Sequence, residues 1–153
     1  MARRREAGVD YVALARFRHE IRRFQNFSEQ AARAAGIEPQ QHQALLAIKG
    51  LPRGSDATVG MLAERLLIRH HSAVELTDRL EAKSLIQRSR GRADRREVIL
   101  HLTQRGEKVL SRLSLPHRAE LRSVARDLLG ALEAALAQTP HARERGHARR
   151  RKK

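Results

Sequence analysis

The residues best suited to chemistry with a charged partner lie in one short stretch, RSRGRADRR at positions 88–96. Five of its nine residues are arginine, and apolar runs flank it, which predicts a hairpin tip. Because like charges repel, a negatively charged partner explains this cluster better than a merely solvated surface, which is the alternative. Asp94 is expected to hold a neighbouring arginine by a charge-assisted hydrogen bond. The residues predicted to bind phosphates or a narrow minor groove are Arg88, Arg90, Arg92, Arg95 and Arg96.

A second polar group lies at the start of a helix predicted from residue 70. In a helix-turn-helix, the first residues of the second helix enter the major groove of DNA. An arginine there can form two hydrogen bonds with guanine, and a glutamate can accept one from cytosine N4. The residues predicted to face DNA are Arg69, His70, His71, Ser72, Glu75 and Arg79. Adjacent histidines diverge by about 100° around a helix, so metal binding by His70 and His71 is the weaker alternative and no metal site is predicted.

The overall charge of the chain agrees with a polyanionic partner. The 153 residues include 32 Lys and Arg against 17 Asp and Glu, a formal net charge of +15. Such a balance favours nucleic acid or an anionic membrane surface. Single-strand binders interleave aromatic and basic residues, whereas the aromatic residues here all lie within the first 27 positions, far along the chain from the arginines. Double-stranded DNA is therefore the favoured partner.

Several functional classes are disfavoured by what the sequence lacks. Without cysteine there is no disulfide, thiolate metal site or thiol redox sensor. No run of about 18 apolar residues occurs and no apolar stretch follows the basic start, so a cytoplasmic protein without a membrane span is expected. The sequence has no nucleophile elbow, glycine-rich phosphate loop or H-E-x-x-H motif, so we predict neither an enzyme nor a bound cofactor.

Apolar periodicity places the candidate sites on a series of helices interrupted by two strands. The predicted helices cover 9–26, 28–35, 39–49, 59–67, 70–83, 104–114 and 116–137, and the predicted strands cover 85–89 and 97–102. The residues expected to begin helices are Ser28, Pro39, Thr58 and Thr103, and those expected to end them are Gly36, Gly50 and Pro116. In the second strand, Val98, Leu100 and Leu102 are expected on one face and Ile99 and His101 on the other.

This order predicts a mainly α fold with a small β wing. A winged helix-turn-helix would cover about 39–102, flanked by dimerisation helices at about 9–35 and 104–137. Residues 1–8 would form a basic arm and residues 138–153 a disordered basic tail. Because each flanking helix has a long apolar stripe, we infer a homodimer; the alternative is that the two helices cover each other within one chain. The predicted interface residues are Leu14, Phe17, Ile21, Leu121, Leu128 and Leu132.

The segment from Thr58 to Leu110 resembles the winged helix-turn-helix of the MarR family of bacterial transcription regulators. The wing sequence Asp94-Arg95-Arg96, followed by Leu102-Thr103-x-x-Gly106, is the most specific matching feature. The other matches are Gly36-Ile37-x-Pro39-x-Gln41, Leu62-Ala63, Ser72-Ala73-Val74 and Asp78-Arg79-Leu80-Glu81, and the similarity extends over about 10–137. Ser84 departs from the family, which commonly has glycine after the recognition helix. A left-handed backbone there would cost about 1 kcal/mol more for serine.

The resemblance implies a homodimer that binds a pseudo-palindromic operator, with Arg96, supported by Asp94, at the minor groove. It also implies a repressor that is relieved by a small phenolic or carboxylic ligand. Family ligands often sit in a cleft near which Arg23, Phe24 and His42 are expected, although the effector-binding residues are not defined by sequence. We therefore expect a sequence-specific DNA-binding transcriptional regulator. The alternative is an architectural, sequence-tolerant protein that coats DNA.

Overall fold

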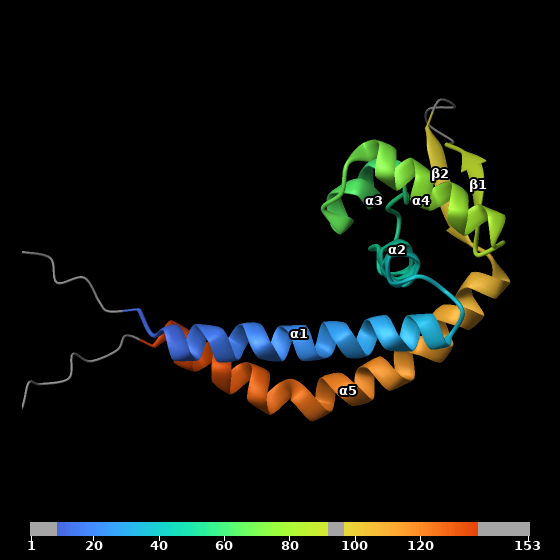
Figure 1. Cartoon of the computed structure of the whole chain (residues 1–153). Helices are drawn as coiled ribbons and strands as arrows, with labels where there is room; N and C mark the ends of the chain where they lie inside the picture. Colours follow the sequence, from blue (N-terminus) through green and yellow to red (C-terminus); the bar gives the residue numbers. More distant parts are fainter. Residues whose placement is uncertain (1–8, 92–96, 138–153) are drawn as a thin grey trace, which may run out of the picture. The chain divides into compact units, whose positions relative to one another are not determined.

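Two short antiparallel strands interrupt an otherwise helical chain (Figure 1). The computed structural model describes residues 9–91 and 97–137. Its helices are α1 (Tyr11–Ala34), α2 (Pro39–Lys49), α3 (Val59–Leu66), α4 (His70–Ala82) and α5 (Gln104–Leu136), and its strands are β1 (Ile86–Arg90) and β2 (Val98–Leu102). Ile86 lies opposite Leu102, and Arg90 lies opposite Val98. The predicted fold class, mainly α with a small wing, is confirmed.

The chain divides into two units, which are described separately. The first unit contains α1 up to Arg22 and α5 from Val124 onward. The second unit, residues 23–123, contains α2, α3, α4, the wing and the adjoining parts of α1 and α5. The predicted basic arm and basic tail lie outside the described residues. The helix-turn-helix and the wing therefore belong to the same unit.

Leucines from three helices and from the wing form the core of the second unit. Leu45 of α2, Leu62 of α3 and Leu80 of α4 are fully buried. Leu85, which precedes β1, and Leu100 of β2 belong to the same cluster. Because the helix-turn-helix and the wing share this core, burial of apolar surface holds α4 and the two strands in one arrangement.

Local capping interactions explain why α2, α3 and α5 begin where the sequence predicts. The Thr58 hydroxyl accepts a hydrogen bond from the Met61 amide (3.1 Å) and caps α3. Pro39 occupies the first turn of α2, where its missing N–H is not needed, and Glu38 and Gln41 form a capping box around it. At α5, the Thr103 hydroxyl accepts from the Gly106 amide (3.1 Å). These interactions involve residues three positions apart, so sequence alone could specify them.

Two predicted helix breaks are wrong. Residues 9–26 and 28–35 form the single helix α1, because the Ser28 hydroxyl contacts Nε2 of His117 (2.8 Å) instead of capping a new helix. Helix α5 continues through Pro116. Proline removes the backbone donor to the Arg112 carbonyl. In the same turns, the Ser114 hydroxyl donates to the Leu110 carbonyl and Nδ1 of His117 donates to the Leu113 carbonyl.

The second strand contains a buried residue on each of its two faces. Ile99 and Leu100 are both buried, although adjacent residues of a strand point to opposite faces. The segment before α3 pairs with the free edge of β2: Thr58 forms a bridge with Ile99, and the Leu100 amide donates to the Ala57 carbonyl (2.7 Å). This additional pairing gives β2 neighbours on both edges, which the strand pattern by itself did not reveal.

A tight backbone junction joins the end of α4 to the start of α5. The Thr103 amide donates to the Leu85 carbonyl (3.1 Å), and the Thr103 hydroxyl donates to the Ser84 carbonyl (2.7 Å). Ser84 has φ = 54°, so the left-handed conformation anticipated at this non-glycine position is present. Gly106 lies against Leu85 so closely that a Cβ atom would be 2.0 Å from the Leu85 carbonyl oxygen.

We expect Ser84→Gly to raise the free energy of unfolding by up to about 1 kcal/mol, because glycine adopts a positive φ without steric cost. Chemical denaturation of both proteins measures the difference. Ser72→Gly is the matched control: Ser72 lies inside α4, so the same exchange there should lower stability by about 0.5–1 kcal/mol. A loss of stability in Ser84→Gly would contradict the strain assigned to this turn.

We expect Gly106→Ala to lower the free energy of unfolding by about 2–3 kcal/mol, because the new methyl group would overlap the Leu85 carbonyl. Thermal and denaturant unfolding provide the measurement. At Gly130 of α5, a Cβ atom would meet nothing within 4 Å beyond the adjacent helix backbone, so Gly130→Ala should leave stability unchanged or raise it by up to about 1 kcal/mol. Equal effects of the two substitutions would rule out the close contact as the cause.

Candidate nucleic-acid interface

The start of α4 presents its polar residues to solvent because the other face of the helix is buried. Ala73, Leu76 and Leu80 form the buried face. Thr77 is also buried, and its hydroxyl donates to the Ala73 carbonyl (2.6 Å). The predicted DNA-facing residues Arg69, His70, His71 and Glu75 are exposed, and Ser72 is partly buried. The start of α4 is therefore accessible to a partner, and contact with DNA there stays a prediction.

The turn between α3 and α4 has an unusual residue. Leu67 ends α3 with φ = 54°, and its side chain is 93% exposed. Its backbone N–H donates to the last turn of α3, which allows α4 to begin three residues later. A fully exposed leucine in a left-handed conformation contributes little to packing, and sequence analysis did not single it out.

Arg88 connects the wing to α4. Its guanidinium forms an ion pair with Asp78, and it lies 3.3 Å from Glu81. Both carboxylates belong to α4, so the arginine links β1 with the helix that precedes it. Sequence analysis assigned Arg88 to phosphate binding and did not identify these partners, although Asp78 and Glu81 are spaced three apart on one helix face.

The structure describes only some of the remaining polar residues of the wing. Arg90 is exposed at the end of β1. On the other face of the hairpin, the Ser89 hydroxyl lies 2.8 Å from Nε2 of His101. Arg92, Asp94, Arg95 and Arg96 lie outside the described residues, so their predicted roles remain predictions.

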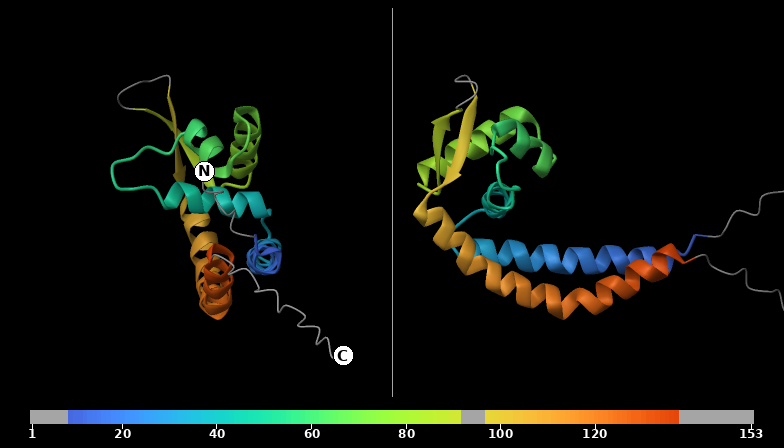
Figure 2. Two further views of the ribbon diagram at one scale, coloured as in Figure 1. Left: turned by 90° about the vertical axis from the view of Figure 1, so that its left-hand side faces the viewer. Right: turned by 180° about the vertical axis from the view of Figure 1, so that it is seen from behind.

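A groove of about 510 Å³ lies between α4 and the wing. It is lined by His70 and Val74 of α4 and by Arg88 and Val98 of the strands, among others. Figure 2 shows the two strands beside the helices of this unit. One accessible face of the second unit therefore combines the start of α4, this groove and the base of the wing.

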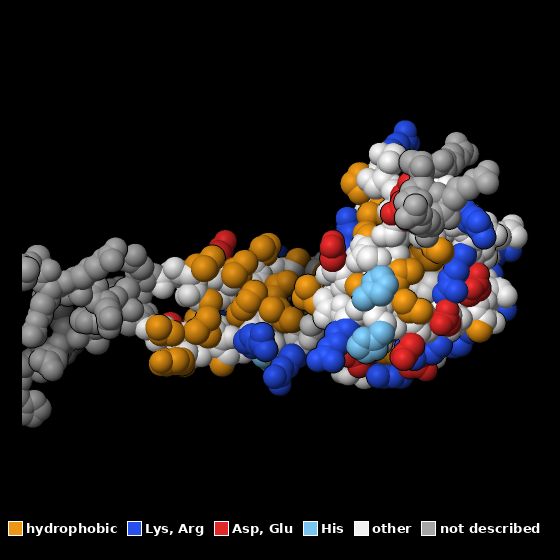
Figure 3. Space-filling model, turned by 90° about the horizontal axis from the view of Figure 1, so that it is seen from above, with side chains coloured by type: hydrophobic (Ala, Val, Ile, Leu, Met, Phe, Trp, Pro, Cys, Tyr) orange, Lys and Arg blue, Asp and Glu red, His pale blue; other side chains and the backbone are white. Residues whose placement is uncertain are grey.

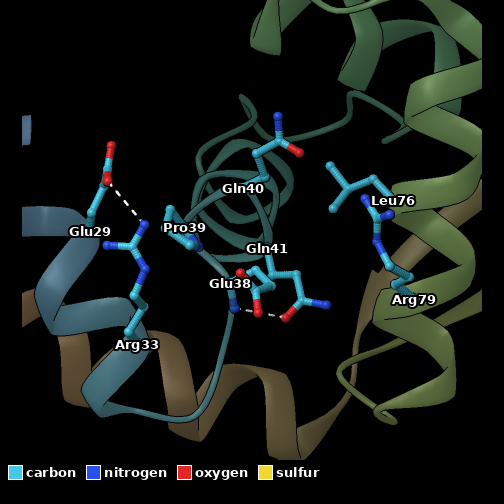
Figure 4. A pocket seen from close by; sticks show the side chains of 8 residues that line it. All are labelled: Glu29, Arg33, Glu38, Pro39, Gln40, Gln41, Leu76 and Arg79. Carbon is cyan, nitrogen blue, oxygen red and sulfur yellow. Dashed lines mark hydrogen bonds and ion pairs between the residues drawn. The ribbon is translucent and has the colours of Figure 1, made fainter.

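Arg79 faces a different groove, of about 560 Å³ (Figure 4). Figure 4 shows Arg79 and Leu76 on one side and Arg33, paired with Glu29 at 3.2 Å, on the other. The N-terminal turn of α2 lies between them. Arg79 is exposed and lines this second groove, and its predicted contact with DNA stays a prediction.

A third cavity, of about 320 Å³, lies where α1, α2 and α5 meet within the second unit. Phe24 and Ser28 of α1, His42 of α2 and His117 of α5 line it, together with Gln25, Glu29, Gln43 and Leu46. Phe24 and His42, which were expected near a ligand cleft, both line this cavity, and Arg23 is not among its lining residues. Sequence analysis did not identify Ser28 or His117, since their contact joins positions 89 residues apart.

His42 is the most unusual titratable residue of this cavity. Its side chain is 4% exposed, and its Nδ1 is buried without a hydrogen-bond partner in the described part of the chain. Burial, and to a lesser degree the nearby His117, lower the pKa of His42 from 6.5 to about 4. The two imidazole centroids are 4.5 Å apart. His42 is therefore uncharged at neutral pH.

In the first unit, apolar side chains gather along both helix segments (Figure 3). Ala13, Val124 and Ala131 are buried, and Arg16 lies 3.9 Å from Asp127, so the two segments contact each other. Among the predicted interface residues, Leu14 is exposed. Leu121 is also exposed, but it belongs to the second unit. The partly buried ones are Phe17, Ile21, Leu128 and Leu132. Other large exposed apolar residues of this unit are Val9, Tyr11, Val12, Leu129 and Leu136. Contact within one chain thus leaves a substantial apolar surface uncovered.

Neither a membrane-spanning segment nor a metal site is found among the described residues. No helix there is long and apolar enough to cross a bilayer. Within 9–91 and 97–137, no group of three or more His, Cys, Asp or Glu side chains could hold a metal ion.

A helix-turn-helix followed by a two-stranded wing defines the winged helix-turn-helix class of protein. Residues 35–97 match the model of the MarR family. The matched segment is less than half of the chain, and it makes the chain similar to the MarR family of transcription regulators.

Individual proteins of known name or structure resemble this chain to different extents. The HTH-type transcriptional repressor MdtR of Bacillus subtilis (strain 168) is 33% identical over 72 residues, which are 47% of this chain and 44% of MdtR. The chain spans less than half the length of the curated relatives it matches. The Bacillus subtilis YusO structure is 25% identical, with a TM-score of 0.58 and coverage of 80% of this chain and 90% of YusO. A mutant of S. aureus MepR bound to an oligodeoxyribonucleotide has the same fold (21% identity, TM-score 0.56, coverage 86% and 87%).

We expect the free energy of unfolding to fall by up to about 3 kcal/mol as the pH decreases from 6.5 to about 4. In this window the unfolded chain binds a proton at His42 and the folded chain does not, so acid favours unfolding. Denaturant unfolding at several pH values measures the slope. His42→Phe keeps an aromatic ring but cannot titrate, so its slope should be smaller. An unchanged slope would show that His42 is not the responsible group.

Proposed function

We propose that the chain is a sequence-specific, double-stranded-DNA-binding transcriptional regulator, and that it acts as a repressor. The observation that carries this proposal is the exposed basic start of α4 beside the wing in a MarR-family winged helix-turn-helix. An exposed helix start with Arg69, His70 and His71 suits the major groove, where base edges differ in their hydrogen-bonding groups. The formal net charge of +15 favours contact with phosphates.

In this proposal the wing has two roles. Arg88, bound to Asp78 and Glu81, positions the strands against α4. Arg90, Arg92, Arg95 and Arg96 then bind phosphates, and Arg96, held by Asp94, enters the adjacent minor groove. The solved MepR complex with an oligodeoxyribonucleotide supports DNA as the partner of this fold. An architectural protein that coats DNA would use the same charges but would show no sequence preference.

The regulator is proposed to be a homodimer that binds a pseudo-palindromic operator. Exposed Val12, Leu14 and Leu129 of the first unit would be covered by a second copy, since large apolar patches on monomers are uncommon. Two recognition helices would then lie about 34 Å apart on the same side of the duplex.

The regulator is also proposed to respond to a small effector, of the phenolic or carboxylic kind that the family resemblance implies. The cavity lined by Phe24, His42 and His117 is the candidate site. The cavity is lined by residues of α1, α2 and α5. A ligand bound there would therefore shift α2 relative to α3 and α4, which pack against it.

We expect Arg96→Ala and Arg69→Ala each to weaken operator binding by about 1–3 kcal/mol, or roughly 5- to 150-fold, because each removes a proposed groove contact. Fluorescence anisotropy with operator DNA gives the affinities. Arg118→Ala is the matched control, since it removes one exposed positive charge from α5. Operator affinity of Arg96→Ala equal to that of Arg118→Ala would contradict the wing assignment. Removal of residues 141–153 should weaken specific and non-specific binding about equally.

We expect the protein to sediment as a dimer and Leu129→Glu to shift it toward the monomer, because a buried unpaired carboxylate opposes association. Leu67→Glu is the matched control, as Leu67 is even more exposed but lies in the second unit. Analytical ultracentrifugation at several concentrations distinguishes the species. A monomeric wild-type protein, or equal dissociation of both variants, would contradict an interface on the first unit.

A further inference from the structure

We propose that the exposed side of α5 in the second unit binds a second DNA duplex, so that the protein bridges two DNA segments. We call this surface the α5 basic face; it consists of Arg105, Lys108, Arg112, Arg118 and Arg122. The inference goes beyond the proposed function, because it assigns DNA binding to a helix outside the helix-turn-helix and the wing. It requires no reading of a base sequence.

The first support is that these cations share one side of the helix. Successive residues of an α-helix are rotated by about 100°, which places the five side chains within about 140° of the helix circumference. The opposite side of the same segment carries Leu110 and Leu113, which are buried in the core of the second unit. Because the core fixes that side, the cations are directed to solvent, and all of them are exposed.

The second support is that the charges of this face have one sign and lack partners. Within the described residues, none of the cations of the α5 basic face forms an ion pair, whereas Arg33, Lys49 and Arg88 of the same unit do. The carboxylate at the start of α5, that of Glu107, lies on another side of the helix and pairs with Lys49 of α2. The α5 basic face therefore keeps its whole positive charge available to a partner.

The third support is the repulsion that this arrangement creates within α5. Lys108 and Arg112 are four residues apart, and so are Arg118 and Arg122. Like charges at this spacing destabilise a helix, whereas a solvated helix surface usually mixes both signs. A bound polyanion would remove the repulsion, so the helix would gain stability from the partner.

The fourth support is that the length and charge density of the face suit double-stranded DNA. The face extends from Arg105 to Arg122, about 25 Å at a rise of about 1.5 Å per residue. A duplex carries one negative charge per about 1.7 Å of its axis, so phosphates are available to every cation along this length. Most of these cations are arginines, whose guanidinium groups can form two parallel hydrogen bonds with a phosphate.

Other polyanions fit this face less well. A helix that lies on a bilayer inserts its apolar side into the lipid, but Leu110 and Leu113 on the apolar side of this segment are buried in the core. Single-stranded nucleic acids stack their bases on aromatic rings, and α5 contains no Phe, Tyr or Trp. A duplex, which is bound through its phosphates, needs neither feature.

The position of the face makes its occupant a separate DNA segment. Figures 1 and 2 show α2 between α4 and α5 within the second unit. The α5 basic face therefore points away from the side on which α4 and the wing would hold the operator. DNA is stiff over about 150 bp, so a short operator does not bend round the unit to reach α5. Two duplexes, or two distant segments of one DNA, would be held at once.

The test measures simultaneous binding of two duplexes by the full-length protein. A duplex that carries the operator is immobilised and saturated with protein, and a fluorescent duplex of unrelated sequence is then added at about 100 mM salt. We expect the wild-type protein to retain the fluorescent duplex. Its affinity should fall steeply with salt, with a logarithmic slope of about −3 to −5, because several phosphates are neutralised.

Two double variants locate the second site. Lys108→Gln with Arg112→Gln should weaken retention of the fluorescent duplex about 10-fold or more and reduce the salt slope by about 2. Operator affinity should stay within about 2-fold of wild type, which also shows that the variant is folded. The matched control is Arg18→Gln with Arg22→Gln, which removes two exposed charges at the same spacing from α1 and should retain the duplex as wild type does.

Several results would overturn the proposal. They are no retention of the fluorescent duplex by wild type, equal losses in the two double variants, or stronger retention of duplex RNA or of phosphatidylcholine–phosphatidylserine vesicles than of duplex DNA. The same assay separates this inference from the proposed function. Operator binding without a second duplex rejects only the α5 basic face, whereas a second duplex that depends on Lys108 and Arg112, without any operator preference, rejects only sequence reading.

Discussion

The structure depends most on the backbone junction between the end of α4 and the start of α5. Two residues of one segment, Ser84 and Leu85, offer carbonyls to Thr103, whose hydroxyl also caps α5. Gly106 is needed because the Leu85 carbonyl occupies the space of a side chain. The junction closes the base of the wing, so the direction of both strands relative to α4 follows from it. These contacts hold the base of the wing next to the end of α4.

The arginines of the second unit lie in two different environments, one paired with carboxylates and one exposed to solvent. Arg88 is paired with Asp78 and Glu81 and thus stabilises the arrangement of wing and helix, although partly exposed ion pairs contribute only about 0–1 kcal/mol each. Arg69 and Arg90 are exposed. The proposed DNA contacts therefore come from arginines at the ends of α4 and β1, on a scaffold that Arg88 helps to hold. The carboxylates of α4 thus serve to hold the wing in this otherwise basic chain.

Sequence predicted the features that depend on neighbouring residues. The starts of α2, α3 and α5 follow from Pro39, Thr58 and Thr103, because a cap needs only residues within one turn. Features that depend on distant residues were missed. Ser28 and Pro116 resemble helix breaks, but α1 and α5 are continuous, and Ser28 instead contacts His117 of the distant helix α5. The pairing of Ile99 with Thr58 likewise joins distant positions, and the partners of Arg88 lie on another element. The MarR resemblance predicted the fold, yet it did not identify His117.

The central claim is that α4 and the wing read a DNA sequence. The most direct test is competitive binding of the purified protein to the intergenic region beside its own gene and to a scrambled duplex of equal length, at about 50–300 mM salt. Non-specific phosphate contacts weaken steeply over this range, whereas base contacts do not depend on counterion release. The account predicts a preference of about 10³-fold or more that persists at the higher salt concentrations. Equal affinity for both duplexes, lost together as salt rises, would contradict it and favour a protein that coats DNA without reading it.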